Sequence, residues 1–180
     1  MSDSCVSIVP KQSVYPNKES MVEEILEWLI LVDVVKATPS DCVLGSNLGH
    51  AVSEGAKVVT EQSHFLPFDL TVNGLEVISK RQVFHTGQNG IDELVCPHCK
   101  DDLVNEEWNF LDEWADYISN NLTCPPCSIP SEIHLYKFRP VWGFSDLGFT
   151  FWNWPQLTVE FIDEFKNKLG CEVDIVYSKI

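Results

Sequence analysis

The chain has 180 residues, a formal net charge of −15, and 44% hydrophobic residues that include ten Phe and six Trp. This apolar content excludes a disordered chain, and the length suits one domain with a sizeable core. The acidity argues against nucleic acid as a partner, because affinity for nucleic acid depends mainly on neutralising phosphates. A basic protein is the partner that such a charge would attract, although the same charge also keeps a protein in solution.

No targeting or membrane segment is expected. The first ten residues contain no basic segment followed by an apolar run, so no secretory signal is predicted. The longest apolar run, residues 25–35, is interrupted by Glu27 and Asp33 and is too short to cross a bilayer. Free thiols in a chain without a signal indicate the reducing cytoplasm and no membrane association.

Two C-x-x-C pairs are the strongest chemical signal in the sequence. Cys96-Pro97-His98-Cys99 and Cys124-Pro125-Pro126-Cys127 enclose an acidic, Trp-bearing segment. Their spacing predicts a zinc site with Cys96, Cys99, Cys124 and Cys127 as its four thiolate ligands. Such a closed tetrahedral site leaves no position for a substrate, so the zinc would be structural. Iron is not excluded, because it binds the same ligands.

Two other interpretations of these cysteines stay open. Cys96 and Cys99 match the active-site tetrapeptide of thiol–disulfide oxidoreductases, which begins a helix. However, Lys100, Asp101 and Asp102 give no apolar helical face, and the second pair has no role in that mechanism. Structural disulfides are the third interpretation.

The first half of the chain predicts a strand, a helix and several short strands. Pro10 would end the first strand, and Asn73-Gly74 would turn a hairpin. The glycine-rich stretch before that hairpin lacks a phosphate-loop motif and is expected to be a surface loop. In order, the expected elements are a strand at 5–9, a helix at 17–31, a strand or frayed helix end at 32–35, the loop at 40–56, the hairpin at 70–78 and a strand at 82–85.

A helix is predicted between the cysteine pairs, at residues 105–120, because Trp108, Leu111, Ala115 and Ile118 fall at helical spacing. Its other faces are acidic. They either face solvent or form a docking surface for a basic partner, and the residues expected to bind such a partner are Glu106, Asp112, Glu113 and Asp116.

The last third predicts a strand, an aromatic hairpin, a helix and a final strand. The strand lies at 133–138, and the hairpin at 141–154 turns at 145–148. Pro155 would begin the helix and Gly170 would cap its end, followed by a strand at 172–177. Large aromatic residues fall on both faces of the hairpin, so they belong either to a core or to a contact surface. Trp142, Trp152 and Trp154 are the expected contact residues.

This order of elements predicts an α+β protein, specifically a ferredoxin-like two-layer sandwich. Residues 1–180 would form one domain, with residues 92–131 as a zinc-ribbon-like insertion carrying the four cysteines.

The aromatic segments resemble a family of small bacterial proteins. The resemblance is carried by Val141-Trp142-Gly143-Phe144, by 151–155 and the chain up to Gly170, and by residues 39–45 and the Cys-Pro-His-Cys turn. It covers most of the chain but implies no activity, because that family is largely uncharacterised. Some members are labelled sugar ABC transporter ATPases. This sequence does not support that label, because it lacks the phosphate-loop motif and is too short.

Three function classes follow. The first is a non-catalytic protein-interaction module, specifically an immunity protein that neutralises a basic bacterial toxin. The second is an enzyme, either a thiol oxidoreductase at Cys96 and Cys99 or a hydrolase in which a histidine acts with a carboxylate. The third is a zinc ribbon that binds nucleic acid. The candidate histidines are His50, His85 and His134, and the nucleic-acid reading requires a basic stripe of Lys80, Arg81, Lys137 and Arg139. The sequence does not give the oligomeric state.

Overall fold

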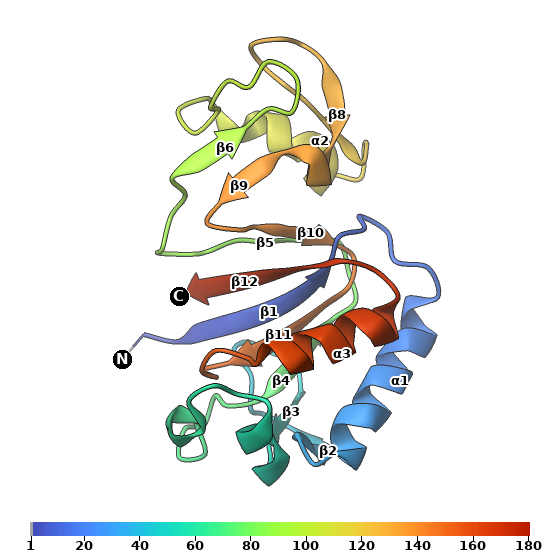
Figure 1. Cartoon of the computed structure of the whole chain (residues 1–180), viewed down its shortest axis with the longest axis vertical. Helices are drawn as coiled ribbons and strands as arrows, with labels where there is room; N and C mark the ends of the chain where they lie inside the picture. The colour runs from blue at the N-terminus through green and yellow to red at the C-terminus, as the bar shows by residue number, and fades with distance from the viewer. Residues whose placement is uncertain (1) are drawn as a thin grey trace.

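The structure is a computed structural model that describes residues 2–180. It is a mixed α and β protein, mostly β, in which two long helices cover a six-stranded antiparallel sheet (Figure 1). A smaller lobe above the sheet carries the paired cysteines. The expected combination of helices, a sheet and a cysteine cluster is therefore confirmed.

One sheet organises most of the chain. Its strand order is β12-β1-β11-β4-β3-β2, and each strand is antiparallel to its neighbours. The strands are β1 (Ser4–Pro10), β2 (Val35–Ser40), β3 (Gly49–Val52), β4 (Leu75–Ile78), β11 (Gly148–Trp152) and β12 (Val173–Lys179). The first and last strands of the chain thus pair with each other, and β12 forms one edge of the sheet.

Helices α1 (Lys18–Leu31) and α3 (Val159–Leu169) lie against one face of the sheet (Figure 1). Alternation in the strands sends every second side chain into this core, as predicted for strands with one face on helices. Helix α3 has its N-cap at Thr158, whose hydroxyl accepts from the Phe161 N–H, and Gly170 follows it with a φ of 65°. The main core includes Val6, Ile8, Ile25, Leu29, Phe149, Phe151, Phe161, Phe165 and Leu169.

A two-stranded ribbon and a loop cover the second face. The ribbon pairs β5 (Gln82–Phe84) with β10 (Gly143–Ser145), and the loop contributes Cys42 and Val43. A β-carbon at Gly143 would lie 2.9 Å from the Val9 side chain. Glycine at this position therefore allows the ribbon to pack closely on β1.

The cysteine lobe (residues 91–139) has its own small core. In it β6 (Glu93–Val95) pairs with β9 (Lys137–Arg139), β7 (Asn121–Thr123) pairs with β8 (Pro130–Glu132), and α2 (Asp112–Ala115) is a single turn. The lobe extends past residue 131, the expected end of the insertion, because β9 completes its first ribbon. The 3₁₀ helices of the chain are η1 (Glu54–Val58), η2 (Ser63–Phe65), η3 (Trp108–Leu111) and η4 (Ile133–Leu135).

Several predicted elements are wrong in extent or pairing. The helix expected at 105–120 is only η3 followed by α2, since Tyr117 with a φ of 61° turns the chain toward β7. The segment 70–72 is not a strand, so β4 has no hairpin partner there. Residues 133–138 form η4 and the start of β9.

The aromatic hairpin is also wrong. Strands β10 and β11 are separated by only two residues but do not pair with each other. Strand β10 joins the ribbon with β5, whereas β11 joins the sheet between β1 and β4.

Candidate metal centre

The four paired cysteines meet in the cysteine lobe, where Cys96 and Cys99 follow β6 and the second pair follows β7. Their sulfur atoms all lie within 4.8 Å of one another. The Cys96 and Cys127 sulfurs are 3.9 Å apart, and those of Cys99 and Cys124 are 3.7 Å apart. A tetrahedral site with metal–sulfur bonds of about 2.3 Å has its sulfurs about 3.8 Å apart. The four side chains are therefore positioned to hold a metal ion, and all of the cysteines are unpaired.

The two cysteine turns share the same backbone design. The Cys96 N–H donates to the Asp101 carbonyl oxygen at 3.1 Å, and the Cys124 N–H donates to the Ile129 carbonyl oxygen at 3.3 Å. The residue after each pair, Lys100 or Ser128, has a positive φ of 65° or 58°. Each turn thus folds its two sulfurs toward the same side, although the residues around them differ.

The environment of the two turns also shifts the pKa values of the thiols. Burial raises the pKa of Cys96, but the backbone N–H groups of His98 and Cys99 lower it, and the outcome is a pKa of about 7. Burial and the neighbouring cysteines raise the pKa of Cys124. Four thiols at this distance cannot all ionise without a cation between them, and a coordinated cation favours the thiolate form.

One side of the sulfur cluster rests on the apolar core of the lobe. Cys96 and Cys124 are fully buried beside Leu94, Leu122 and Trp114. Tyr136 closes this core, and its hydroxyl donates to the Leu122 carbonyl oxygen at 3.0 Å. Burial, and then the charge of the nearby cysteines, raise the pKa of this phenol. Two of the four cysteines therefore belong to the apolar core of the lobe, whereas Cys99 and Cys127 are half-buried at its margin.

Arg81 connects the lobe to the sheet. Its guanidinium lies 4.0 Å over the Trp114 ring and donates to the carbonyl oxygens of Trp114 at 2.7 Å and Ser119 at 2.9 Å. Trp114 in turn donates its indole N–H to the Ser13 hydroxyl at 2.7 Å. From the sequence, Arg81 was expected only as a possible nucleic-acid contact. No local sequence pattern shows that an arginine after β4 contacts residues 33 to 39 positions further along the chain.

Of the other three residues in the expected basic stripe, two form ion pairs and one is exposed. Lys137 and Arg139 on β9 both contact Glu93, at 3.3 Å each, and Lys80 is exposed. With Arg81 committed to the lobe, these four residues do not present the free cationic row that a nucleic acid requires.

Of the four expected acidic contact residues, Asp112 and Glu113 lie in α2, Asp116 follows it, and Glu106 lies before η3. Glu106, Asp112 and Asp116 are exposed. Glu113 is half-buried and accepts a hydrogen bond from the Thr123 hydroxyl at 3.2 Å, so it braces β7. The structure thus leaves three of the four carboxylates free at the surface.

The three expected tryptophan contacts separate into interior and cleft residues. Trp152 and Trp154 are buried, and their indole N–H groups donate to the Glu76 carboxylate at 2.9 Å and to the Asn73 carbonyl oxygen at 2.8 Å. They are interior side chains and are not available to a partner in this structure. Trp142 is half-buried and stacks on Phe138 with ring centroids 5.7 Å apart.

Among residues 2–180, none of the candidate catalytic histidines contacts a nucleophilic side chain. His50 contacts the Lys36 carbonyl oxygen at 2.9 Å, and His85 accepts from the Gly87 N–H at 3.0 Å. His134 contacts Glu132 at 2.6 Å through Nδ1 and the Phe144 carbonyl oxygen at 2.8 Å through Nε2. Since Nε2 donates to a carbonyl oxygen, the His134–Glu132 pair has no hydroxyl or thiol to activate.

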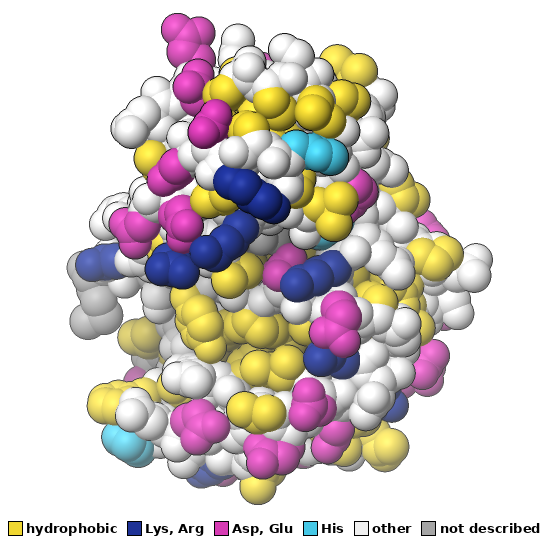
Figure 2. Space-filling model, turned by 45° about the horizontal axis from the view of Figure 1, so that its top comes forward, with side chains coloured by type: hydrophobic (Ala, Val, Ile, Leu, Met, Phe, Trp, Pro, Cys, Tyr) yellow, Lys and Arg dark blue, Asp and Glu magenta, His cyan; other side chains and the backbone are white. Residues whose placement is uncertain are grey.

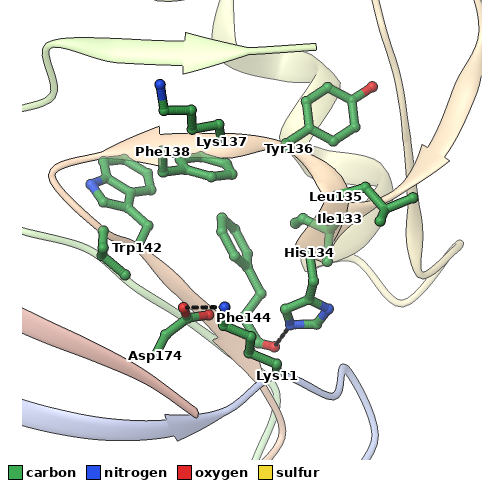
Figure 3. Close-up of a pocket in the computed structure, with 11 residues that line it drawn as sticks. Lys11, Ile133, His134, Leu135, Tyr136, Lys137, Phe138, Trp142, Phe144 and Asp174 are labelled. Carbon is green, nitrogen blue, oxygen red and sulfur yellow. Dashed lines mark hydrogen bonds and ion pairs between the residues drawn. The ribbon is translucent and has the colours of Figure 1, made fainter. Parts of the chain in front are cut away.

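A cleft of about 320 Å³ between the lobe and the sheet was not foreseen (Figure 3). Its walls are Phe138, Trp142 and Phe144, and its floor holds the ion pair of Lys11 and Asp174, 3.5 Å apart. These residues come from the two ends and the last third of the chain. Only the pairing of β1 with β12 brings Lys11 to Asp174, and the sequence carries no local signal of it.

Comparison with protein-family models, with curated proteins and with solved structures found no match for this chain. Within residues 2–180, none of the helices combines the length and the apolar character needed to span a lipid bilayer.

Proposed function

We propose that the chain is a non-catalytic, cytoplasmic protein-interaction module in which a structural zinc ion holds the cysteine lobe in shape. The closed set of four sulfurs supports a structural ion, because it offers no position for a substrate. The internal hydrogen bonds of His134 support a role without catalysis. Zinc is the proposed ion. Iron is the alternative that metal analysis of the purified protein distinguishes.

The proposed fold assignment is a ferredoxin-like sandwich extended by two strands. Four of the six strands, in the order β12-β1-β11-β4, form an antiparallel unit with α1 after β1 and α3 before β12. Strands β3 and β2 add to its far edge, and the cysteine lobe is inserted between β4 and β11. This arrangement supports the expected split βαβ pattern.

The single observation that carries the interaction proposal is a pair of exposed apolar side chains next to exposed carboxylates in the cysteine lobe. Tyr117 and Ile118 are 66% and 73% exposed, and they follow the exposed Asp112 at the start of α2 and the exposed Asp116 at its C-cap. Tyr117 has a φ of 61°, which costs free energy for a bulky residue. Apolar anchors inside a charged rim are the usual anatomy of a protein contact.

The proposed partner is a basic protein. The net charge of −15 would speed its capture, and Tyr117 and Ile118 would supply contact area once it is bound. The most specific form of the proposal is an immunity protein that neutralises a basic bacterial toxin. The resemblance to small bacterial proteins supports a bacterial setting but no particular toxin.

The test is native mass spectrometry of the protein from its own cells, followed by direct binding measurements with the identified partner. A double Asp112→Asn and Asp116→Asn variant should bind a basic partner at least tenfold more weakly at low salt, mainly through slower association. The matched control is Glu23→Gln with Glu27→Gln, which removes two exposed carboxylates with the same spacing on α1. Equal affinities for the two double variants would refute this surface, and an acidic partner would refute the charge argument.

A further inference from the structure

The edge strand β12 has two sets of backbone groups, one facing β1 and one facing away. The Lys11 N–H donates to the Glu172 carbonyl oxygen, and the Ile180 N–H donates to that of Asp3, at 2.9 Å each. Hydrogen-bonded pairs alternate in an antiparallel ladder, so residues 172, 174, 176, 178 and 180 bond to β1. The backbone groups of Val173, Ile175, Tyr177 and Lys179 therefore face outward.

Another part of the chain already pairs with the last of these residues. The Lys179 N–H donates to the Thr86 carbonyl oxygen at 3.2 Å, and the Gln88 N–H donates to the Lys179 carbonyl oxygen at 2.7 Å. This is a parallel bridge between Gly87 and Lys179. The outer edge of β12 thus accepts an added segment at its C-terminal end.

The remainder of this edge is unpaired. Among residues 2–180, no backbone partner is described for the outward groups of Val173 and Ile175 or for the Tyr177 N–H. The open stretch, residues 173–177, is about 17 Å long at the usual rise per residue. Unpaired edges of this kind bind extended peptides as additional strands.

The cleft adjoins the open stretch. Asp174, whose side chain lies on the opposite face of β12 from the helices, forms part of the cleft floor with Lys11 (Figure 3). Phe138, Trp142 and Phe144 supply an aromatic wall above it. Because side chains alternate along a strand, a peptide added to β12 would direct every second side chain toward this wall.

The surroundings of the cleft are basic although the protein is acidic. Lys11 and Lys137 line it, Arg139 ends β9, and Lys179 ends β12. In the space-filling view, Lys and Arg side chains gather around a central area of exposed apolar side chains (Figure 2). Glu93 pairs with the two cations of β9, and Asp174 pairs with Lys11. These four cations outnumber the two carboxylates that pair with them by two, which favours an acidic occupant.

We propose that the open edge of β12 and the adjoining cleft bind an extended acidic segment of another protein as an added strand. An aromatic or apolar side chain of this segment occupies the cleft, and carboxylates two residues to either side of it, which point to the same face, lie near Lys11 and Lys137. This inference does not depend on the proposed function, which concerns the acidic surface around α2.

The probe for the test is the synthetic peptide acetyl-Glu-Val-Phe-Val-Glu-amide, in which Phe and both Glu side chains share one face of an extended strand, titrated into the full chain and followed by NMR. The expected result is saturable shifts of the Val173, Ile175 and Tyr177 amides, and a change in the Trp142 indole signal. A peptide with lysine in place of glutamate, and one N-methylated at alternate amides, should each bind at least tenfold more weakly.

Two variants complete the test. Ile175→Pro removes an outward N–H that makes no bond to β1, and Trp142→Ala removes one of the three rings of the aromatic wall. Each variant should bind the probe peptide at least tenfold more weakly and should retain the circular dichroism spectrum of the wild type. Should Ile175→Pro fail to fold, the N-methylated peptide examines the same hydrogen bonds on the wild-type chain. The proposal is overturned by no binding at millimolar peptide, by equal binding of the N-methylated peptide, by shifts confined to other strands, or by a dimer that buries this edge.

Discussion

Asp174 is a carboxylate whose burial raises its pKa above the ordinary value of 3.8, although Lys11 lies 3.5 Å away and acts in the opposite direction. A carboxyl group with a raised pKa holds its proton more tightly in the folded state than in the unfolded state. Its contribution to stability is therefore fully present below pH 3.8 and is lost as the pH rises through the folded pKa.

Asp174→Asn should consequently raise the free energy of unfolding at pH 7, because it removes the cost of burying a charge. The advantage over the wild type should shrink as the pH falls toward 3.8. Urea denaturation of both proteins between neutral and acidic pH measures this difference. An advantage that grows on acidification would show that the Lys11 ion pair, and not burial, dominates.

Ser128 adopts a positive φ of 58° directly after the second cysteine pair, where glycine is the least strained residue. It is exposed, and its hydroxyl makes no described hydrogen bond. Ser128→Gly should therefore stabilise the protein by about 0.5–1 kcal/mol, after the extra entropy of glycine in the unfolded chain is subtracted. Ser128→Val is the matched control and should destabilise it. Thermal unfolding of the metal-loaded protein checks both, and a lower Tm for Ser128→Gly would contradict the backbone argument.

At the scale of elements, Arg81 joins the cysteine lobe to the sheet through a planar group that lysine cannot reproduce. It donates to two carbonyl oxygens and to the Asn120 side chain, and it stacks on Trp114. Arg81→Lys keeps the charge but loses the fork and the stacking.

We expect Arg81→Lys to cost about 2 kcal/mol, the scale of hydrogen bonds to a charged group. Faster hydrogen exchange should appear in α2 and β7 before it appears in β1 or β11. Lys80→Arg, at the exposed neighbouring position, is the control and should change neither quantity. Equally faster hydrogen exchange in the lobe and in the sheet would mean that Arg81 stabilises the whole protein and not the lobe in particular.

Elements with a strong local pattern were predictable from the sequence. Strand β1, helices α1 and α3, strand β12 and the cysteine cluster each follow from alternation, helical spacing or paired cysteines. The C-cap at Gly170 also followed, because glycine after an apolar helical stripe is a common end signal.

The sequence did not show that β10 and β11 pair with different strands, because contacts with distant residues fix the turn between them. The Asp146 carboxylate accepts from the Tyr15 N–H at 2.7 Å and from Lys18 Nζ at 3.0 Å. These contacts attach the turn to Tyr15 and to the first residue of α1, so β10 and β11 enter different layers. A local hairpin pattern contains no information about a contact 131 residues away.

The predicted helix between the cysteine pairs failed for a related reason. Its helical spacing is real, but Arg81 and Ser119 fix the chain just beyond α2, and Tyr117 reverses its direction. Tertiary contacts of this kind override propensity in short segments. The cleft and its ion pair were likewise invisible, because β1 and β12 meet across the whole length of the chain.

Viewed as a whole, the described part of the molecule has two large apolar cores, one between helices and sheet and one in the cysteine lobe, and two smaller apolar clusters. The lobe core is small and includes Cys96 and Cys124, so a metal ion bound by the four sulfurs would contribute directly to its stability. The larger core contains none of the four paired cysteines. Removal of the metal should therefore unfold the cysteine lobe without unfolding the sheet.

Chelation under reducing conditions, or the Cys96→Ser and Cys124→Ser double variant, should unfold residues 91–139 and leave the six-stranded sheet folded. Hydrogen exchange should show lost protection at Leu94 and Leu122 and retained protection at Ile8 and Phe149, all of which are buried. Cys5→Ser with Cys42→Ser is the control, because both residues lie outside the cluster. Retained protection throughout the chelated lobe would show that its packing is sufficient without a metal.

Native mass spectrometry combined with elemental analysis of the protein purified from its own cells tests the structural metal centre most directly. The expected result is one zinc ion per chain, released only when the cysteine lobe unfolds. A metal-free chain that carries an oxidised Cys96–Cys99 pair would contradict it and would favour thiol–disulfide chemistry instead.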